Sequence, residues 1–197
     1  RFTHPELKLA YEAPTGFYMM NGTRAVAING QSGRGQFTTG PFSGDLDAYV
    51  RGAFGALTEQ GQQKIDPGQI SRTTVNGLPA AYATTRVNNG ESTVEVTVFA
   101  YQLGPDQAYH FVTITPAGGA AVFDSMYRSM RRISAAEAAA IKPRKLAVIT
   151  TKASDTVQSM AQRMAYTDAP LERFLVLNGL TSTSKLAAGQ KVKIVTY

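Results

Sequence analysis

The chain has no cysteine and no tryptophan, and only two histidines, His4 and His110, among its 197 residues. Without cysteine it can form neither a disulfide nor a thiolate metal site, a composition compatible with cytoplasm or periplasm. Two histidines far apart in sequence, with no HExxH pattern, exclude a zinc site built on three imidazoles. We therefore expect no catalytic residue, metal ligand or cofactor in this chain, and we interpret both histidines as structural or surface residues.

Other catalytic patterns are missing too. There is no G-x-S-x-G nucleophile elbow, and Gly30–Gly35 lacks the Lys and Ser/Thr of a phosphate loop, so we expect a flexible hairpin tip there. Glu91 and Glu95 point to the same face of a predicted strand, where solvent exposure is the expectation. Because no apolar run approaches about 18 residues, the sequence predicts no membrane span.

Length and charge suggest one large and one small domain. With 43% hydrophobic residues the chain can bury a real core. Residues 1–140 contain 11 Lys and Arg against 11 Asp and Glu, whereas residues 141–197 contain 9 against 3. The small basic part suits an anionic polymer such as the bacterial cell wall. No nucleic-acid motif accompanies the charge, so we expect no nucleic-acid partner. Because the chain starts at Arg1, we expect it to be cut from a longer protein.

Residues 1–134 have the pattern of an α+β domain with an antiparallel sheet covered by helices. The turn signals Asn76-Gly77 and Asn89-Gly90 imply neighbouring antiparallel strands. One helix is predicted near Leu46–Gln60, and a second is predicted to contain Phe123, Met126, Tyr127, Met130 and Ile133. Arg128, Arg131 and Arg132 are predicted at the end of that second helix, with a structural role. The predicted strands are Leu7–Glu12, Ala25–Asn29, Ile70–Val75, Ala80–Val87, Thr93–Leu103 and Tyr109–Thr115.

Residues 135–144 are predicted to be a helical, proline-containing linker, and residues 145–197 a second domain. A strand is predicted over Leu146–Ile149, after Pro143 has prevented a helix from continuing. Asp155 stands three residues before Gln158, the spacing of a capping box. The first helix then carries Val157, Met160, Ala161 and Met164 on one face. A second helix is predicted from an Asp168 cap and Pro170 to Gly179, and a last strand over Lys191–Val195.

This second domain resembles the LysM repeat. The resemblance rests on Ser154-Asp155-Thr156-Val157, Leu177-Asn178-Gly179-Leu180, and Gly189-Gln190-Lys191-Val192-Lys193-Ile194. It implies a βααβ fold that binds N-acetylglucosamine polymers such as peptidoglycan between the loops Ala153–Val157 and Asn178–Thr183. The residues implied at the glycan are Ser154, Asp155, Thr156, Val157, Asn178, Gly179, Leu180 and Thr181. Helix capping by Asp155 and a helix stop at Asn178-Gly179 explain the same residues without a ligand.

The larger domain is similar in its predicted order of elements to the sandwich of the PsbP and Mog1 families. The opening Phe2-Thr3-His4-Pro5-Glu6-Leu7 and Ala13-Pro14-Thr15-Gly16-Phe17, joined to a LysM-like end, resembles the C-terminal region of bacterial envelope zinc metallopeptidases of the HtpX-like type. This resemblance implies an accessory region in the periplasm or cell envelope. Zinc is then expected only in a catalytic domain upstream of this chain.

Three functions are open at this point. The first is a non-catalytic accessory region of a periplasmic zinc-dependent protease, tethered to peptidoglycan and in contact with the upstream catalytic domain. The second is a pair of protein-interaction modules with an envelope protein as partner, in which the LysM-like fold is only a scaffold. The third is an independent enzyme such as a wall hydrolase. We prefer the first, because the sequence has no catalytic signature.

Overall fold

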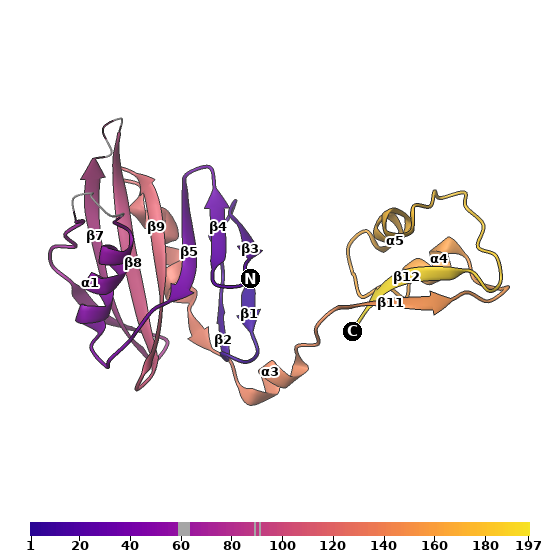
Figure 1. Ribbon diagram of the computed structural model, residues 1–197, viewed down its shortest axis with the longest axis horizontal. Coiled ribbons are helices and arrows are strands. Elements are labelled where there is room, and N and C mark those ends of the chain that lie inside the picture. Colours follow the sequence, from indigo (N-terminus) through magenta and orange to yellow (C-terminus); the bar gives the residue numbers. More distant parts are fainter. Residues whose placement is uncertain (59–63, 89, 91) are drawn as a thin grey trace. The chain divides into compact units, whose positions relative to one another are not determined.

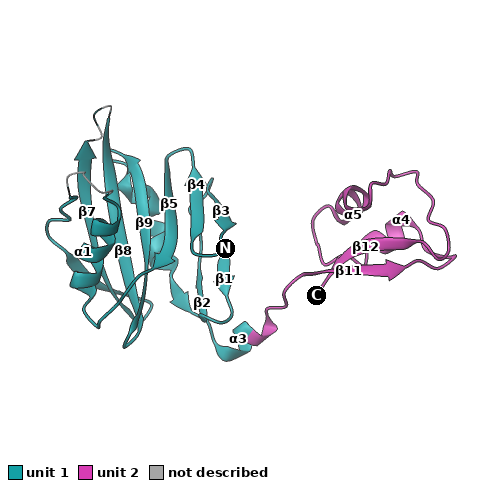
Figure 2. Cartoon of the chain, in the orientation of Figure 1, with its two compact units in different colours: residues 1–138 teal, residues 139–197 magenta. Residues whose placement is uncertain are grey.

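The structure, a computed structural model, describes residues 1–58, 64–88, 90 and 92–197. The chain divides into two compact units, unit 1 with residues 1–138 and unit 2 with residues 139–197 (Figure 2). The boundary falls inside helix α3, Ala135–Ala140, within the segment where the sequence predicts a linker. Each unit has its own hydrophobic core, and each is described here by itself.

Unit 1 is built on a seven-stranded antiparallel sheet in the order β3-β4-β5-β9-β8-β7-β6 (Figure 1). Consecutive strands are neighbours except between β5 and β6, where the chain leaves the sheet through helix α1 and β9 takes the place beside β5. The strands are β3 (Tyr18–Asn21), β4 (Val26–Gly30), β5 (Gly33–Thr39), β6 (Ser71–Val75), β7 (Leu78–Asn88), β8 (Thr93–Gly104) and β9 (Gln107–Pro116).

Helix α1, Leu46–Ala56, covers one face of this sheet over β7 and β8. Asp45 begins the helix by accepting a hydrogen bond from the Asp47 amide at 2.9 Å. The buried side chains of Val50 and Phe54 then pack on alanines and valines of the strands. These small strand residues let the helix approach the sheet closely. The predicted helix end at Gln60 lies outside the described residues, and the described helix ends at Ala56.

The other face carries the aromatic core and is covered by the remaining elements of unit 1. A three-stranded sheet in the order β1-β2-β10 lies there with the 3₁₀ helix η1 and helix α2. Tyr11 of β2 and Phe123 of η1 pack with Phe111 of the large sheet. Unit 1 is therefore α+β, with an antiparallel sheet covered by helices, which confirms the predicted fold class. The covering elements are β1 (Phe2–His4), β2 (Leu9–Tyr11), β10 (Arg131–Arg132), η1 (Ala120–Phe123) and α2 (Asp124–Ser129).

One helix prediction for unit 1 is wrong in detail, and several strands were not predicted. Helix α2 ends at Ser129, and Arg131 and Arg132 form strand β10 beside β2. The spacing of Met130 and Ile133 suggested more helix, but the Ile133 amide donates to the Lys8 carbonyl at 2.9 Å and continues the strand pairing. The hairpin predicted at Gly30–Gly35 is present, with Gly30 opposite Gly33 at its turn. Strands β1, β3 and β5 were not predicted, and Asn89 of the second predicted turn lies outside the described residues.

Unit 2 has the order strand, helix, helix, strand that the sequence predicts. Strands β11 (Lys145–Thr150) and β12 (Lys191–Thr196) pair antiparallel along their whole length, from Lys145 opposite Thr196 to Thr150 opposite Lys191. Helices α4 (Val157–Ala161) and α5 (Pro170–Asn178) lie between them in the chain. Their core side chains are Val157, Met160, Ala161, Met164, Phe174, Val192 and Ile194. Membership of the LysM family stays a prediction.

Both helix starts in unit 2 differ from prediction. Thr156, not Asp155, is the N-cap of α4, and Ala169, not Asp168, precedes α5 in a left-handed conformation with no side-chain cap. Asp168 pairs instead with Arg173. Helix α4 ends at Ala161, so the buried Met164 belongs to the irregular segment that follows. Within the part of the chain that the structure describes, no helix is both long and apolar enough to cross a bilayer.

Candidate functional site

The loop after β11 holds the first group of predicted site residues and is closed by Asp155. Its carboxylate accepts the Lys152 amide at 2.7 Å, and its own amide donates to the Lys152 carbonyl at 3.1 Å. Ser154 between them is exposed. Thr156 then forms a capping box with Ser159, through amide-to-hydroxyl bonds of 3.1 and 2.9 Å. Asp155 therefore shapes the loop, and the capping role predicted for it belongs to the next residue.

The side chain of Val157 is not available to a ligand. It is 2% exposed and belongs to the core of unit 2, because it is the first residue of α4 and faces the sheet. Only its backbone can lie near a molecule bound at the loop. Of the first predicted group, Ser154 thus remains as an exposed polar side chain.

Asn178, the central residue of the second group, is a structural clamp. It is the last residue of α5, and its side-chain amide donates to the Phe174 carbonyl at 3.0 Å and to the Lys193 carbonyl at 2.8 Å. Its side-chain oxygen accepts the Lys193 amide at 2.7 Å. The side chain thereby satisfies both polar backbone groups of Lys193, as a neighbouring strand would. These bonds occupy both amide hydrogens of Asn178, so we do not expect this side chain to donate to a sugar.

Gly179 and Leu180 end helix α5 as the sequence predicts. Gly179 is left-handed, and the Leu180 amide donates back to the Leu175 carbonyl at 2.9 Å, the pattern of a Schellman motif. Leu180 packs at the edge of the core. Thr181, in contrast, is exposed and begins a turn that its carbonyl closes by accepting the Ser184 amide at 3.0 Å. Three hydroxyls gather in this turn, since Thr181 Oγ1 lies 3.2 Å from Thr183 Oγ1 and 3.1 Å from Ser184 Oγ.

Thr151 joins the two loops and was not predicted. Its amide donates to the Gln190 carbonyl at 2.9 Å, and its carbonyl accepts the Gly189 amide at 2.9 Å. Its hydroxyl donates to the Ala187 carbonyl at 2.6 Å, and the residue is 3% exposed. Residues 187–190, the last part of the second loop, therefore lie beside Thr151 at the end of the pair where Thr150 is opposite Lys191. The sequence shows only a threonine just after a predicted strand. Its hydrogen-bond partners are distant in sequence, so this role could not be predicted.

The exposed surface of these two loops is polar and mostly uncharged. The exposed neutral residues are Ala153, Ser154, Thr181, Ser182 and Thr183, with Lys152 and Lys185 nearby in the chain. Hydroxyl groups donate and accept hydrogen bonds, as do the hydroxyl and N-acetyl groups of an amino sugar.

Unit 2 also has a hollow of about 370 Å³ that the sequence did not predict. Tyr166 and Val176 line it together with Arg173. The guanidinium groups of Arg144 and Arg173 lie 4.3 and 4.5 Å from the centre of the Tyr166 ring, which holds the residues before β11 against the start of α5.

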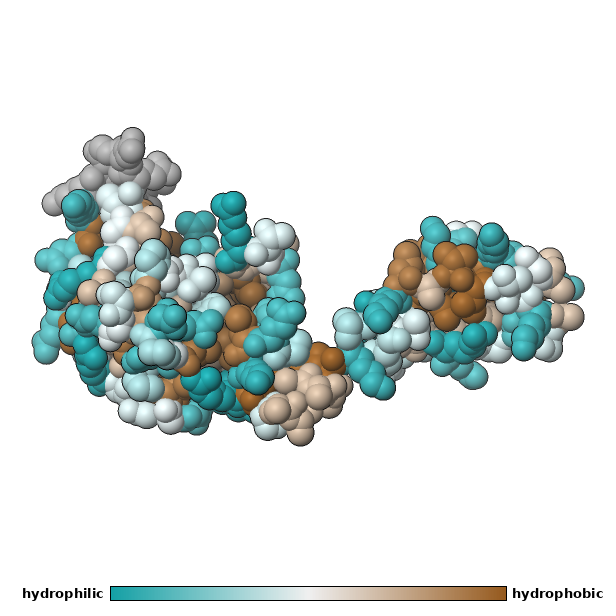
Figure 3. Space-filling model, turned by 60° about the horizontal axis from the view of Figure 1, so that its bottom comes forward, coloured by the Kyte–Doolittle hydropathy of each residue, from teal (hydrophilic) through white to brown (hydrophobic). Residues whose placement is uncertain are grey.

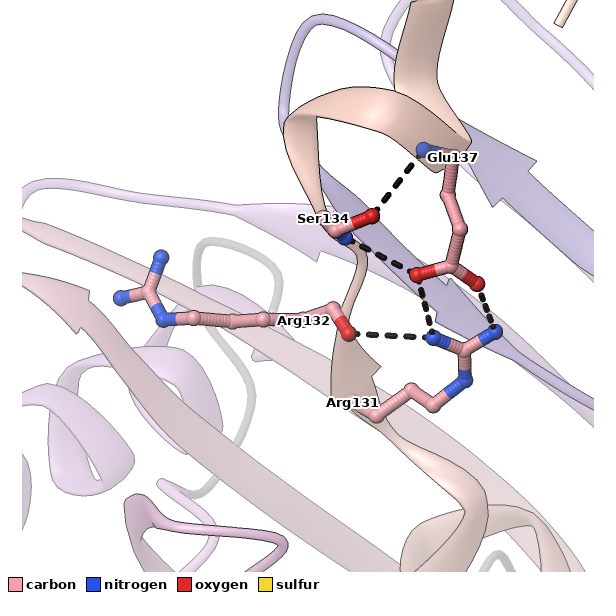
Figure 4. A network of polar contacts seen from close by, with 4 residues as sticks. All are labelled: Arg131, Arg132, Ser134 and Glu137. Atoms are coloured by element: carbon pink, nitrogen blue, oxygen red, sulfur yellow. Dashed lines mark hydrogen bonds and ion pairs between the residues drawn. The ribbon is translucent and has the colours of Figure 1, made fainter. Parts of the chain in front are cut away.

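Of the three arginines predicted at a helix end, Arg128 lies in the last turn of α2, whereas Arg131 and Arg132 are strand residues with structural contacts (Figure 4). Arg131 makes a two-pronged ion pair with Glu137, with contacts of 2.9 and 3.3 Å. Glu137 also accepts the Ser134 amide at 2.9 Å, while the Ser134 hydroxyl accepts the Glu137 amide, so the pair forms a capping box at the start of α3. The hydrogen bonds from Arg131, followed by that from Ser134, lower the pKa of Glu137 to about 2.

The side chain of Glu95 is largely buried and hydrogen-bonded, whereas the sequence predicted that it would be exposed to solvent. Its side chain is 11% exposed and accepts the Ala120 amide at 3.2 Å and the Arg86 side chain at 3.3 Å. Backbone hydrogen bonds, first from Gly118, keep its pKa below the usual range. Its predicted neighbour Glu91 lies outside the described residues. Among the described residues, no three His, Cys, Asp or Glu side chains gather as a metal site requires.

A cavity lies on each face of the sheet of unit 1. The cavity on the aromatic face measures about 420 Å³ and is lined by threonines of β6 to β8 together with Tyr82 and Tyr127. The cavity on the face of α1 measures about 460 Å³ and is lined by Tyr49 and His110 among others. Neither was predicted, because each is made by residues from strands that become neighbours only in the folded sheet.

No family model matches the chain. No curated protein matches it either. A crystal structure from Bacteroides thetaiotaomicron VPI-5482 is similar over 78% of this chain and 53% of its own, with a TM-score of 0.49 and 12% sequence identity. The chain thus spans about half the length of that protein. A likeness this distant assigns no function.

Proposed function

We propose that the chain is a non-catalytic binding region of a larger periplasmic zinc-dependent protease, and that unit 2 binds N-acetylglucosamine polymers such as peptidoglycan. The observation that carries the glycan part is the joining of the two loops through Thr151. Thr151 bonds to Ala187, Gly189 and Gln190, so the loop of Ser154 meets the last part of the 179–190 loop, which begins with the Thr181–Ser184 hydroxyl turn. The sequence resemblance supplies the ligand class, and the protease and the periplasmic location rest on that resemblance alone.

The structure changes which residues we expect at the glycan. Val157 is buried and Asn178 is committed to the backbone of Lys193, so neither side chain is a contact. Backbone groups of 153–156 and the hydroxyls of Ser154, Thr181 and Ser182 are then the groups that bind. Such a surface pairs with hydroxyl and N-acetyl groups over a shallow area, and its affinity does not depend on full charges.

The positive charge of residues 141–197 offers a competing explanation for wall binding. These residues have 9 Lys and Arg against 3 Asp and Glu, and such a surface attracts anionic wall polymers without a sugar site. Charge attraction between exposed groups weakens strongly between about 0.1 and about 1 M salt, whereas hydrogen bonding to a neutral sugar does not. Neutral tetra-N-acetylchitotetraose therefore separates the two modes.

The test uses the chain 1–197 and two blocking variants, Ser154→Trp and Ser182→Trp, each at an exposed loop position. Val148→Trp, on the 61% exposed side of β11, is the matched control with the same added bulk. We expect each loop variant to bind chitotetraose and sedimenting peptidoglycan at least about tenfold more weakly than the control, a loss of about 1.4 kcal/mol. Equal binding by all three variants, or binding only at low salt, would refute the glycan site.

The accessory role has a separate test. An antibody against residues 1–197 should detect a native form well above 21.1 kDa in cell extracts. A native form near that mass would remove the protease from the proposal and leave the glycan site unaffected.

A protein partner for unit 2 is a second candidate, favoured by exposed apolar side chains. Leu146 and Val148 of β11 are 62% and 61% exposed, and Val176 of α5 is 83% exposed. Figure 3 shows an apolar area on the face of unit 2 that is turned to the viewer. If an envelope protein binds there, Leu146→Lys and Val148→Lys will abolish its recovery in cross-linking, while Ser154→Trp will not. Recovery that is lost only in Ser154→Trp would contradict this candidate.

A further inference from the structure

The cavity on the α1 face of unit 1 has the dimensions of a small-molecule site. It lies between α1 and strands β5 and β9, and its volume of about 460 Å³ is within the usual range of ligand pockets. Ala48, Gly52 and Ala56, one helical turn apart, form the helix side of its wall, and Thr38 and His110 lie on the sheet side. The wall is thus made of small residues on one side and polar groups on the other.

His110 and Tyr49 form a buried polar pair at this cavity. His110 is 6% and Tyr49 5% exposed, and the Tyr49 hydroxyl lies 2.9 Å from His110 Nδ1. The same hydroxyl accepts the Gly40 amide at 3.1 Å and lies 3.0 Å from the Ala108 carbonyl. Nδ1 therefore has a partner within the protein. Among the described residues Nε2 has no hydrogen-bond partner, and it is not one of the fully buried unpaired atoms, so it is accessible from the cavity that His110 lines.

Both tautomers of His110 leave Nε2 able to form one hydrogen bond. If the Tyr49 hydroxyl donates to the Ala108 carbonyl, Nδ1 carries the proton and Nε2 accepts. If the hydroxyl donates to Nδ1, Nε2 carries the proton and donates. A group that can both donate and accept, such as a hydroxyl or a primary amide, satisfies Nε2 in either case.

The cavity favours uncharged molecules. Burial lowers the pKa of His110 to about 4 and raises the pKa of Tyr49, so both side chains are neutral near neutral pH. Asp45 is the one acidic residue in the described lining, and it caps α1 at 2.9 Å and pairs with Arg72 at 3.2 Å. A charged ligand would therefore lose its hydration without gaining an unpaired opposite charge.

Gly52 lies on the exposed helix side of the cavity. A Cβ added there would meet no atom within 4 Å, so a larger side chain at this position has room to extend over the cavity.

We propose that this cavity binds a small uncharged molecule with an apolar body and one hydroxyl or amide group, which hydrogen-bonds to His110 Nε2. The apolar body lies against Ala48, Gly52 and Ala53 of the helix, and the polar group faces β9. This site is independent of the glycan site proposed for unit 2.

The test follows the ring nitrogens of His110 by NMR, which is simple because the chain has only 2 histidines. The probes are p-cresol, indole, benzamide and cyclohexanol, each at about 10 mM, because molecules of this size bind weakly. Benzoate and benzylammonium are the charged controls. We expect at least one neutral probe to shift the Nε2 resonance saturably, and neither charged control to do so.

Two variants locate the site. Gly52→Leu fills the cavity and should weaken the binding of the effective probe at least about tenfold, whereas Gly52→Ala should keep it within about twofold. If Gly52→Leu fails to fold, as judged by its amide spectrum, Ala56→Leu fills the same cavity from the last residue of α1. No shift with any of the four neutral probes, or equal binding by the filled variant, would overturn the proposal.

Discussion

The variant Asn178→Ala tests whether the Asn178 side chain stabilises unit 2 or contacts the sugar. The side chain makes three hydrogen bonds, one to the Phe174 carbonyl and two to the backbone of Lys193. All three are lost in Asn178→Ala. The backbone groups of Lys193 then depend on water, which reaches them because this part of β12 is exposed.

The loss of stability can be worked out from these bonds. Each contributes about 0.5–1.5 kcal/mol net, so three give about 3 kcal/mol. Partial solvation of the freed groups and the better helix propensity of alanine offset about 1 kcal/mol of this loss. We therefore expect the free energy of unfolding of unit 2 to fall by about 2 kcal/mol. A core of this size supports only about 3–5 kcal/mol, so unit 2 loses about half of its stability yet stays folded in most molecules.

The assay is a urea titration of the chain 1–197, with unit 2 followed through the amide resonances of its core residues Met160, Phe174 and Val192. Thr181→Ala is the control for stability only, because its hydroxyl bonds only to other hydroxyls of the same turn. Affinity for chitotetraose is measured on Asn178→Ala and on the parent chain under folding conditions. For Asn178→Ala we expect the stability loss above together with an affinity within about twofold of the parent chain, because most molecules remain folded.

The opposite pattern would refute the structural interpretation of Asn178. A change in unfolding free energy below about 0.5 kcal/mol, together with a tenfold or larger loss of affinity, would mean that the side chain contacts the sugar.

Three further predictions concern pH and helix capping. Because the pKa of His110 is about 4 in the folded chain against 6.5 as the reference value, the unfolded chain binds more protons between these pH values. When the pH falls from about 7.5 to about 5, the free energy of unfolding of unit 1 should decrease by about 2 kcal/mol more in the parent chain than in His110→Gln, as measured by urea titration. Equal decreases in the two proteins would contradict this prediction. Since the pKa of Glu137 is lowered from 4.5 to about 2, its stabilisation of α3 is present above pH 4.5 and lost as the pH falls toward 2. Glu137→Gln should remove that acid dependence from amide exchange at Ala138, and an unchanged dependence would exclude the ion pair as its cause. Thr156→Ala should cost unit 2 about 1 kcal/mol in urea titration through the lost cap of α4, and no change would place the cap elsewhere.

The elements with strong local signals could be predicted from sequence. Helix α1 has an acidic cap and an apolar stripe, and the β6–β7 turn at Asn76-Gly77 has the residues that tight hairpins favour. In unit 2, Pro170 and Gly179 bracket the second helix as prediction required. Such signals depend on neighbours within a few residues, which a sequence shows directly.

Elements that depend on distant partners were missed. Strand β10 exists because Arg131 and Arg132 pair with β2, more than a hundred positions earlier, and nothing local distinguishes it from a helix end. The glycines of the Gly30–Gly35 segment suggested flexibility. However, Gly35 lies within β5, and a Cβ there would be 2.8 Å from the Val112 carbonyl, so this glycine allows close approach to β9.

The glycan site stays a prediction, and the structure shows what its predicted residues do within the fold. The two loops were identified from the LysM resemblance, and the structure joins them through Thr151. The sequence could not show which loop residues are structural, because the Asn178 side chain hydrogen-bonds to the backbone of a residue 15 positions away. Burial of Val157 follows the helical stripe that was itself predicted, so this residue could have been removed from the contact set earlier.

Titration of the isotope-labelled chain 1–197 with tetra-N-acetylchitotetraose in about 0.5 M salt tests the glycan site most directly, because charge attraction is largely screened there. Saturable shifts confined to the amides of residues 151–156 and 179–184 are the predicted result. Shifts elsewhere on unit 2, or none at all while peptidoglycan still sediments with the chain at low salt, would show that its basic charge, and not a sugar site, attaches it to the wall.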